Sequence, residues 1–190
     1  IAWQIDNELG GEISFCYCEK CEKKFQNYLN KKFKTIENFN KCMGTYFWGH
    51  IYRNWDQIQI PKRQNDNPSL LLEYKKFQSS QIINFLKIQV EILKRITPEK
   101  LITHNLMGFF PYVDYYELSK YLDVVSFDFY YNWNKNIEKI DYLWSASSDF
   151  MRSMKKKNYW IMETSAGPIG NREMSRNVRP GEMRKMNFLS

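Results

Sequence analysis

Residues 1–8 have the sequence IAWQIDNE, and this stretch sets the pattern for the whole fold. Its first six residues are mostly apolar, include β-branched and aromatic side chains, and lead into a polar run. This composition predicts a buried strand over residues 1–6. Three further segments of the same character are expected to be strands: Leu101–Met107, Val124–Tyr130 and Tyr159–Glu163.

Helical patterns separate the predicted strands. Glu19–Phe33 is a charged segment with apolar residues at helical spacing. A longer helix is expected to begin at Pro68 and to stop before Pro98, because Asn67 is a favourable cap and proline suits the first helical position. Further helices are expected over Asn38–Met43, residues 47–58, Val113–Tyr121 and Ser145–Lys156.

Strands that alternate with helices predict a parallel sheet, so the expected fold class is α/β. Two architectures fit four such units in 190 residues, a small doubly wound domain and half of a (β/α)8 TIM barrel. The sequence contains neither a GxGxxG motif nor a Walker-type loop. The chain has no initiator methionine and ends in a helix-like run from Pro180, so both ends look cut, which favours the partial barrel.

The composition restricts the classes of partner. The formal net charge is +7, with 28 Lys and Arg against 21 Asp and Glu. One interpretation of this basic charge is that the protein binds a nucleic acid. The lysines are scattered and form no single block, so a solvated surface is favoured and no nucleic acid is expected. Mean hydropathy is −0.61, and no apolar run approaches the roughly 18 residues of a membrane span. The aromatic content of 17% suits either a packed core or stacking on sugar rings.

Two carboxylates close predicted strands, Glu8 after the first and Glu163 at the end of the fourth. In parallel barrels, the C-terminal ends of the strands face the active site. Two carboxyl groups suffice for glycoside hydrolysis, because one protonates the leaving oxygen and the other attacks the anomeric carbon. Either residue alone would better suit a helix N-terminus contact or a lysine salt bridge, whereas the pair at two strand ends shifts the balance toward catalysis.

Three of the four cysteines, Cys16, Cys18 and Cys21, fall within six residues. Thiolates at this spacing suit a structural Zn²⁺, which takes four ligands in a tetrahedron, better than a secreted disulfide framework. We therefore expect a cytoplasmic protein. Three free thiols are the alternative, and a catalytic cysteine is disfavoured because His50 and His104 show no local pairing signature.

Seven segments, taken in order, carry a resemblance to a known family: residues 3–8, 16–21, 44–48, 67–70, 103–108, 160–163 and 180–184. Together they resemble glycoside hydrolase family 42, the β-galactosidases. The resemblance implies that residues 1–190 are part of one TIM-barrel catalytic domain, truncated at both ends and covering roughly strands four to seven. It also implies a retaining β-galactosidase that releases terminal non-reducing β-D-galactose from a β-galactoside oligosaccharide.

The resemblance also implies residue roles. Glu8 would be the general acid/base and Glu163 the nucleophile, with their carboxyl groups ~5–5.5 Å apart, as a covalent galactosyl intermediate requires. Asn7 would donate to the sugar 2-hydroxyl. Trp48 would form a wall of the galactose subsite, although without the family it would equally suit the core. One departure concerns galactose preference, because the aromatic residue that the family carries near Asn171 is missing.

The family likeness extends to the metal and the assembly. Members that carry the cysteine motif bind zinc, so Cys16, Cys18 and Cys21 would be ligands, with the fourth outside this chain. Cys42 is expected to be a small buried residue and not a ligand. A homotrimer is implied by the family alone.

Three rival functions remain open at this level. They are another retaining β-glycosidase of the same barrel clan, a zinc-containing nucleic-acid-binding module and a carbohydrate-binding relative without catalysis. The module would need a second CxxC or histidine pair at ~12–20 residues, which the sequence lacks. The two glutamates argue against the third. The isolated chain is expected to be inactive, because a partial barrel leaves two open sheet edges.

Overall fold

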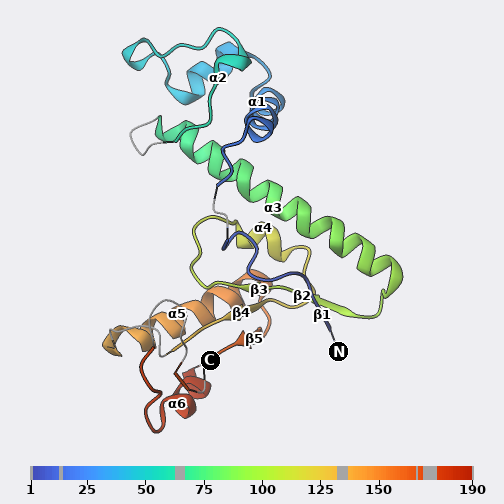
Figure 1. The fold of residues 1–190 in the computed structure, drawn as a ribbon, viewed down its shortest axis with the longest axis vertical. Helices are drawn as coiled ribbons and strands as arrows, with labels where there is room; N and C mark the ends of the chain where they lie inside the picture. The colour runs from blue at the N-terminus through green and yellow to red at the C-terminus, as the bar shows by residue number, and fades with distance from the viewer. Residues whose placement is uncertain are drawn as a thin grey trace. The chain divides into compact units, whose positions relative to one another are not determined.

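A computed structural model describes residues 2–12, 15–62, 67–131, 137–165, 167–168 and 175–189. Within these ranges the side chains of four residues are outside the description: Trp48, Ile137, Glu138 and Leu189. The chain divides into two compact units (Figure 1). Unit 1 comprises Ile1–Leu9 and Phe85–Ser190, and unit 2 comprises Gly10–Asn84. The long helix α3, Pro68–Ile96, contributes to both.

Unit 1 contains the parallel strands that the sequence predicts, in shorter form. They are β1 Ala2–Gln4, β2 Leu101–Thr103, β3 Asn105–Leu106, β4 Ser126–Asp128 and β5 Trp160–Glu163. Strand β1 pairs with β2, and β3, β4 and β5 form a second sheet in that order, every pair being parallel (Figure 1). The predicted strand over 101–107 is interrupted at His104 between β2 and β3.

Three helices complete unit 1, α4 Tyr115–Ser119, α5 Ile137–Lys155 and α6 Glu182–Leu189. Trp144 of α5 is fully buried against the sheet, with its ring centroid 5.7 Å from that of Phe127 and 4.8 Å from that of Phe129. Its indole N–H donates to the Met186 carbonyl at 3.0 Å. A side chain of this size contributes about 2–3 kcal/mol by burial, so Trp144 holds α5 and α6 on the sheet.

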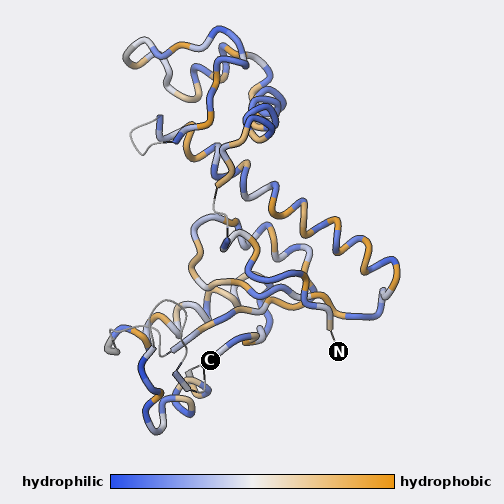
Figure 2. Tube along the Cα trace, in the orientation of Figure 1, coloured by the Kyte–Doolittle hydropathy of each residue, from blue (hydrophilic) through white to orange (hydrophobic). Residues whose placement is uncertain are grey.

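Unit 2 is helical. It contains α1 Glu19–Phe33, α2 Ile36–Met43, two short 3-10 turns and the first part of α3. Its core is aromatic, with Phe25, Tyr74 and Phe77 fully or almost fully buried and their ring centroids 5.0–6.0 Å apart. The apolar residues that predicted α1 therefore face this core. Along α3, hydrophobic and hydrophilic positions alternate with the helical period (Figure 2).

Two expectations for unit 2 are wrong. The predicted helix over 47–58 is replaced by two 3-10 turns, Phe47–Gly49 and Trp55–Gln57. Gly49 has a φ of +69°, which a continuing α-helix does not allow, and Asn54 caps the second turn. Cys42 is exposed, because α2 turns Phe39, Asn40 and Met43 inward and leaves Cys42 to the side.

Helix α5 begins at Ile137, upstream of the predicted start at Ser145. Within the described ranges, every helix is too short or too polar to span a bilayer.

Candidate active site

The candidate functional side chains of unit 1 lie close to the C-terminal ends of parallel strands. Glu163 is the last residue of β5, Asp128 is the last residue of β4, and Glu8 lies in the turn that follows β1. Asp128 and Glu163 are register partners across the β4–β5 pair. The C-terminal ends of parallel strands meet at one edge, so the fold brings these three carboxyl groups to one place.

Asn105 connects the groups at this edge through hydrogen bonds. It is fully buried, and its side-chain oxygen accepts two hydrogen bonds, one from the last residue of β1 and one from the turn after it. One comes from the Gln4 side-chain amide at 3.1 Å, and the other from the backbone N–H of Glu8 at 3.2 Å. The backbone that carries Glu8 is therefore fixed to β3.

The amide nitrogen of Asn105 donates in the opposite direction. Its distance is 2.6 Å to Asp128 Oδ2, 2.9 Å to Asn7 Oδ1 and 3.4 Å to Glu163 Oε1. An amide carries only two protons, so the longest of these contacts is the weakest. One side chain thus contacts the backbone of Glu8 and the carboxylate of Glu163 at the same time.

The turn after β1 has unusual backbone geometry. Asp6 has a φ of +51° and Glu8 a φ of +39°, both in the left-handed region. The Asp6 side chain accepts from the Asn7 N–H at 2.8 Å, a local bond that helps an aspartate to adopt this conformation. A glutamate gains no such help. Strain of this kind, of order 1–3 kcal/mol, persists where the surrounding structure enforces it, typically at functional sites.

His104 fixes the same turn from its other side. Its Nδ1 lies 2.6 Å from the Ile5 carbonyl, and its Nε2 accepts from the Leu9 N–H at 3.2 Å. These partners require a neutral ring with its proton on Nδ1. Burial is the largest cause that lowers the pKa of His104 below its ordinary value of 6.5, so the ring stays neutral at neutral pH.

Glu163 receives hydrogen bonds on both carboxylate oxygens. Asn105 donates to Oε1, and the Tyr130 hydroxyl donates to Oε2. The backbone carbonyl of Glu163 accepts from the Phe129 N–H at 3.0 Å, which fixes its main chain. Burial, and then the neighbouring Glu163, raise the pKa of Tyr130, so its hydroxyl remains a donor. Donors on both oxygens hold the carboxyl group in one orientation.

Asp128 is a third carboxyl group at this edge. It is 7% exposed, and its pKa is raised to about 7. Burial is the largest cause. The charge of Glu163 and the contact with Glu8 add to it, against the opposing hydrogen bond from Asn105. A carboxyl group that titrates near neutral pH is a frequent property of functional sites.

The structure brings together three of the four predicted catalytic and substrate-binding residues. Glu8, Asn7 and Glu163 all contact Asn105. Trp48 belongs to unit 2, where its backbone forms part of the turn Phe47–Gly49 and its side chain lies outside the description. Asn171 also lies outside the described residues. The separation of ~5–5.5 Å between the two carboxyl groups stays a prediction.

Four residues of the site were not predicted: His104, Asn105, Asp128 and Tyr130. A signal was available for His104, Asn105 and Asp128, because polar residues inside the apolar segments 101–107 and 124–130 need a buried partner or a function.

The cysteine cluster lies in unit 2, at the start of α1. The Sγ atoms of Cys16, Cys18 and Cys21 all lie within 4.8 Å of one another, and those of Cys16 and Cys18 are 3.4 Å apart. A tetrahedral zinc with Zn–S bonds of ~2.3 Å separates its sulfurs by ~3.8 Å, so the three thiols fit such a site. Tyr74 donates its hydroxyl to the Cys16 carbonyl, which fixes the loop against the aromatic core.

The thiols differ in their electrostatic surroundings. Hydrogen bonds, the largest from the backbone of Cys21, lower the pKa of Cys18 to about 7. Burial is the largest cause that raises the pKa of Cys21 to about 12. The Cys18 thiol is therefore partly ionised at neutral pH, before any metal binds. Cys42 is not part of the cluster, and its thiol contacts Asn38 Oδ1 at 3.7 Å.

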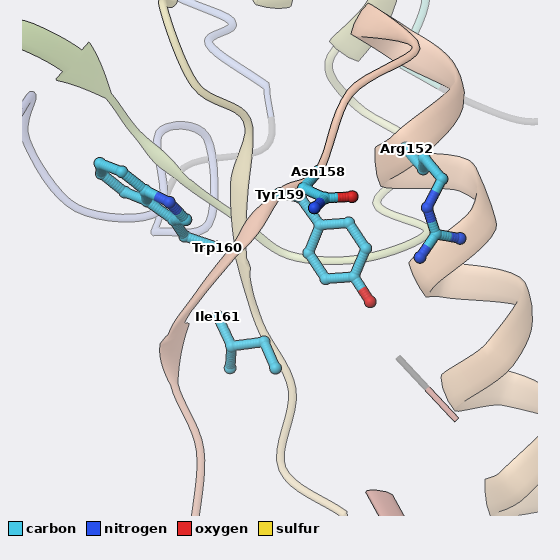
Figure 3. Close-up of a pocket in the computed structure, with 5 residues that line it drawn as sticks. All are labelled: Arg152, Asn158, Tyr159, Trp160 and Ile161. Carbon is cyan, nitrogen blue, oxygen red and sulfur yellow. The ribbon is translucent and has the colours of Figure 1, made fainter. Parts of the chain in front are cut away.

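Two hollows are lined by residues other than these carboxylates. One, of about 440 Å³, is at the N-terminal end of β5, where Tyr159 faces Arg152 of α5 and Trp160 points away from that helix (Figure 3). The Arg152 guanidinium lies 5.5 Å from the Tyr159 ring centroid. The N-terminal end of barrel strands generally serves stability, so this hollow is not the candidate active site.

The second hollow, of about 610 Å³, lies in unit 2 and is lined by residues that include Thr45, Phe47, His50 and Tyr52. It adjoins the turn that carries Trp48 on the chain.

Comparisons with known proteins show the family and the fold of the chain. The family model Glyco_hydro_42, described as beta-galactosidase, matches residues 1–190. The chain belongs to this family. It is 36% identical to the beta-galactosidase LacZ of Heyndrickxia coagulans over 190 residues, which are 99% of this chain and 28% of that protein. It is 35% identical to BgaA of Clostridium cellulovorans over 192 residues, with 99% and 29% covered. The chain thus spans less than a third of these relatives.

Solved structures of the family show the same fold. The beta-galactosidase of Marinomonas ef1 superposes with a TM-score of 0.88 and 30% identity, covering 98% of this chain and 31% of the other. That of Bacillus circulans superposes with a TM-score of 0.86 and 32% identity, covering 99% and 28%. The predicted α/β class and partial TIM barrel are thereby confirmed. An agarase, AgWH50C, shares the fold alone, at 17% identity and a TM-score of 0.59.

Proposed function

We propose that the protein containing this chain is a retaining β-galactosidase in which Glu163 is the nucleophile and Glu8 the general acid/base. Membership of family 42 supports the reaction class. The observation that carries the residue assignment is the Asn105 side chain, which holds both the Glu8 backbone and the Glu163 carboxylate.

The chemistry follows from this pair. The Glu163 carboxylate attacks the anomeric carbon, the glycosidic C–O bond breaks, and Glu8 gives its proton to the departing oxygen. Glu163 is then bound to the sugar as an ester. In the second half, Glu8 takes a proton from water, the resulting hydroxide attacks the anomeric carbon, and the ester bond breaks to release the sugar. Tyr130 and Asn105 orient Glu163 through their hydrogen bonds to its two oxygens.

Substrate contacts are part of the same proposal. Asn7 would bind the sugar 2-hydroxyl through the side chain that Asn105 orients. Trp48 would form an apolar wall for a galactose ring, and a β-galactoside oligosaccharide would be the substrate. A cytoplasmic location and a homotrimer stay predictions from the sequence.

A structural zinc ion is proposed for Cys16, Cys18 and Cys21, whose sulfur atoms are close enough together to share one ion. A zinc ion with four protein ligands has no open position, so it would stabilise the loop before α1 and take no part in hydrolysis. A fourth ligand is expected from outside these residues.

The test is chemical rescue in the full-length protein with an aryl β-galactoside. Glu163→Ala should lower kcat by at least about 10⁴-fold, and azide should restore turnover with an inverted, α-configured galactosyl azide as product. In Glu8→Ala, azide should instead give the β-configured azide, because it then attacks the covalent intermediate. Glu117→Ala removes an exposed glutamate paired with Lys120 and serves as the matched control.

Activity that survives in Glu163→Ala would refute the nucleophile assignment. A panel of aryl β-glycosides distinguishes the proposed galactosidase from another retaining β-glycosidase of the same clan, since only the former prefers the galactoside.

A further inference from the structure

Asp128 is a third carboxyl group in the site, and the proposed reaction of Glu8 and Glu163 assigns it no role. It closes β4 and is more than nine-tenths buried. Its Oδ2 accepts from Asn105 at 2.6 Å. Its Oδ1 is buried and has no hydrogen-bond donor among the described residues. A buried carboxylate oxygen without a donor is destabilising, so its surroundings require an explanation.

The neighbouring Glu8 explains how the buried Oδ1 of Asp128 can be satisfied. Asn105 donates to Asp128 and accepts from the Glu8 N–H, which makes the two acidic residues neighbours, and the Glu8 carboxyl is one of the groups that raise the pKa of Asp128. Two ionised carboxylates are acceptors only, so they repel and leave the facing oxygens unsatisfied. A single proton between them converts the repulsion into a charge-assisted hydrogen bond. We infer that Asp128 and Glu8 share one proton in the resting site, and that Asp128 thereby keeps the general acid loaded.

The titratable groups around Asp128 are all acids, and they come from four segments of unit 1: Glu8 after β1, Tyr115 of α4, Tyr130 after β4 and Glu163 of β5. The two tyrosines have raised pKa values and stay neutral, so the neighbours that favour a proton on Asp128 are Glu163 and Glu8, against the hydrogen bond from Asn105. The rise in the pKa of Asp128 to about 7 agrees with the retention of one proton up to neutral pH. In such a pair, the proton belongs to both groups and not to either residue alone.

The shared proton also keeps the charge of the site constant through the proposed reaction, on which this inference rests. Before the reaction, Glu163 carries one negative charge and the pair of Asp128 and Glu8 carries another. In the first half, the proton leaves with the aglycone, so the pair carries two charges while Glu163 becomes a neutral ester. The total is two before and two after. Asp128 makes no contact with the sugar in this scheme and is a positioning residue.

The test is the pH dependence of kcat/KM in the full-length enzyme. This parameter reports the ionisations of the free enzyme, and its alkaline limb reports loss of the acid proton. Asp128→Asn keeps the size of the side chain and removes its charge. Without the neighbouring anion, the acid loses its proton earlier, so the alkaline limb should move to lower pH by at least about one unit.

Asp128→Ser is a second neutral variant, smaller and still able to bond with Asn105, in case the first does not fold. Asp149→Asn removes the same charge from an exposed position of α5 paired with Arg152 and should leave the limb in place.

A uniform fall in kcat/KM with an unmoved alkaline limb would overturn the inference and leave Asp128 a structural residue. If the wild-type protein did not hydrolyse aryl β-galactosides, the proposed function itself would fail. The two failures are therefore distinguishable.

Discussion

The variant Asn105→Ala tests how far one amide organises the active site. The substitution removes two accepted hydrogen bonds, from Gln4 and from the Glu8 N–H, and the donated bonds to Asn7, Asp128 and Glu163. Neutral hydrogen bonds contribute about 1 kcal/mol each and those to charged groups about 1.5–3 kcal/mol. Because water will enter the truncated site and replace part of this, we expect the free energy of unfolding to fall by about 2–4 kcal/mol.

The effect on turnover should exceed the effect on binding. The Glu8 backbone and the Glu163 carboxylate each lose a hydrogen bond that fixes their position. A displacement of about 1 Å costs about 100-fold in rate, or about 2.7 kcal/mol. The assay is hydrolysis of an aryl β-galactoside by the full-length protein, at a temperature where thermal unfolding shows the variant to be folded. We expect kcat to fall about 100-fold, with a smaller change in KM.

The matched control is Asn40→Ala in unit 2. Asn40 is also buried, and it accepts from the Thr45 hydroxyl at 2.6 Å and the Tyr52 N–H at 3.0 Å and donates to the Tyr52 carbonyl at 2.7 Å. It should lose comparable stability and keep kcat within about threefold of the wild-type value. If folded Asn105→Ala retained wild-type kcat, or if both variants lost activity equally, Asn105 would be a stability residue only.

Three further predictions concern other parts of the chain. Tyr130→Phe removes the hydroxyl that donates to Glu163, so kcat should fall about 10–100-fold, whereas Tyr142→Phe at an exposed position should leave kcat unchanged. The pKa of His104 is lowered in the folded state, so below its ordinary value of 6.5 the unfolded chain takes up the proton first. The Tm should therefore drop between pH 7 and pH 5, and His104→Gln should show a smaller drop; equal drops would contradict this linkage. Elemental analysis of the full-length protein should find one zinc per chain, lost with a lower Tm in Cys18→Ser and retained in Cys42→Ser; equal zinc in both variants would exclude the proposed ligand.

The sequence predicted well what local patterns determine. Short apolar segments between helical ones predicted the parallel strands, and the structure has Glu163 at the end of β5 and Glu8 in the turn after β1, whereas their catalytic roles stay predictions. The helix expected over 47–58 failed because a local apolar period was overridden by Gly49 and by the cap at Asn54. Periodicity gives only a weak preference, and turn chemistry can decide against it.

The organisation of the site was beyond the reach of sequence patterns for a different reason. Asn105 matters because of what other strands bring to it, and nothing in its own neighbourhood in the chain specifies those partners. The same holds for Asp128, whose pKa is raised by its burial and by the neighbouring Glu163 and Glu8. Such roles arise from tertiary packing, where the surroundings of a side chain and not its type set its chemistry.

The hydrogen bonds of Asn105 also have a consequence for how the protein folds. They join residues that are 101, 98, 97, 58 and 23 positions apart along the chain. Contacts of such high sequence separation require loops to close before they return any energy, so they form late and slow the folding reaction. Helices α1, α3 and α5 can therefore appear early without creating any catalytic capacity. Recovery of enzymatic turnover during refolding should be one of the last signals to appear. It requires β1, β4 and β5 to pack against β3, which carries Asn105.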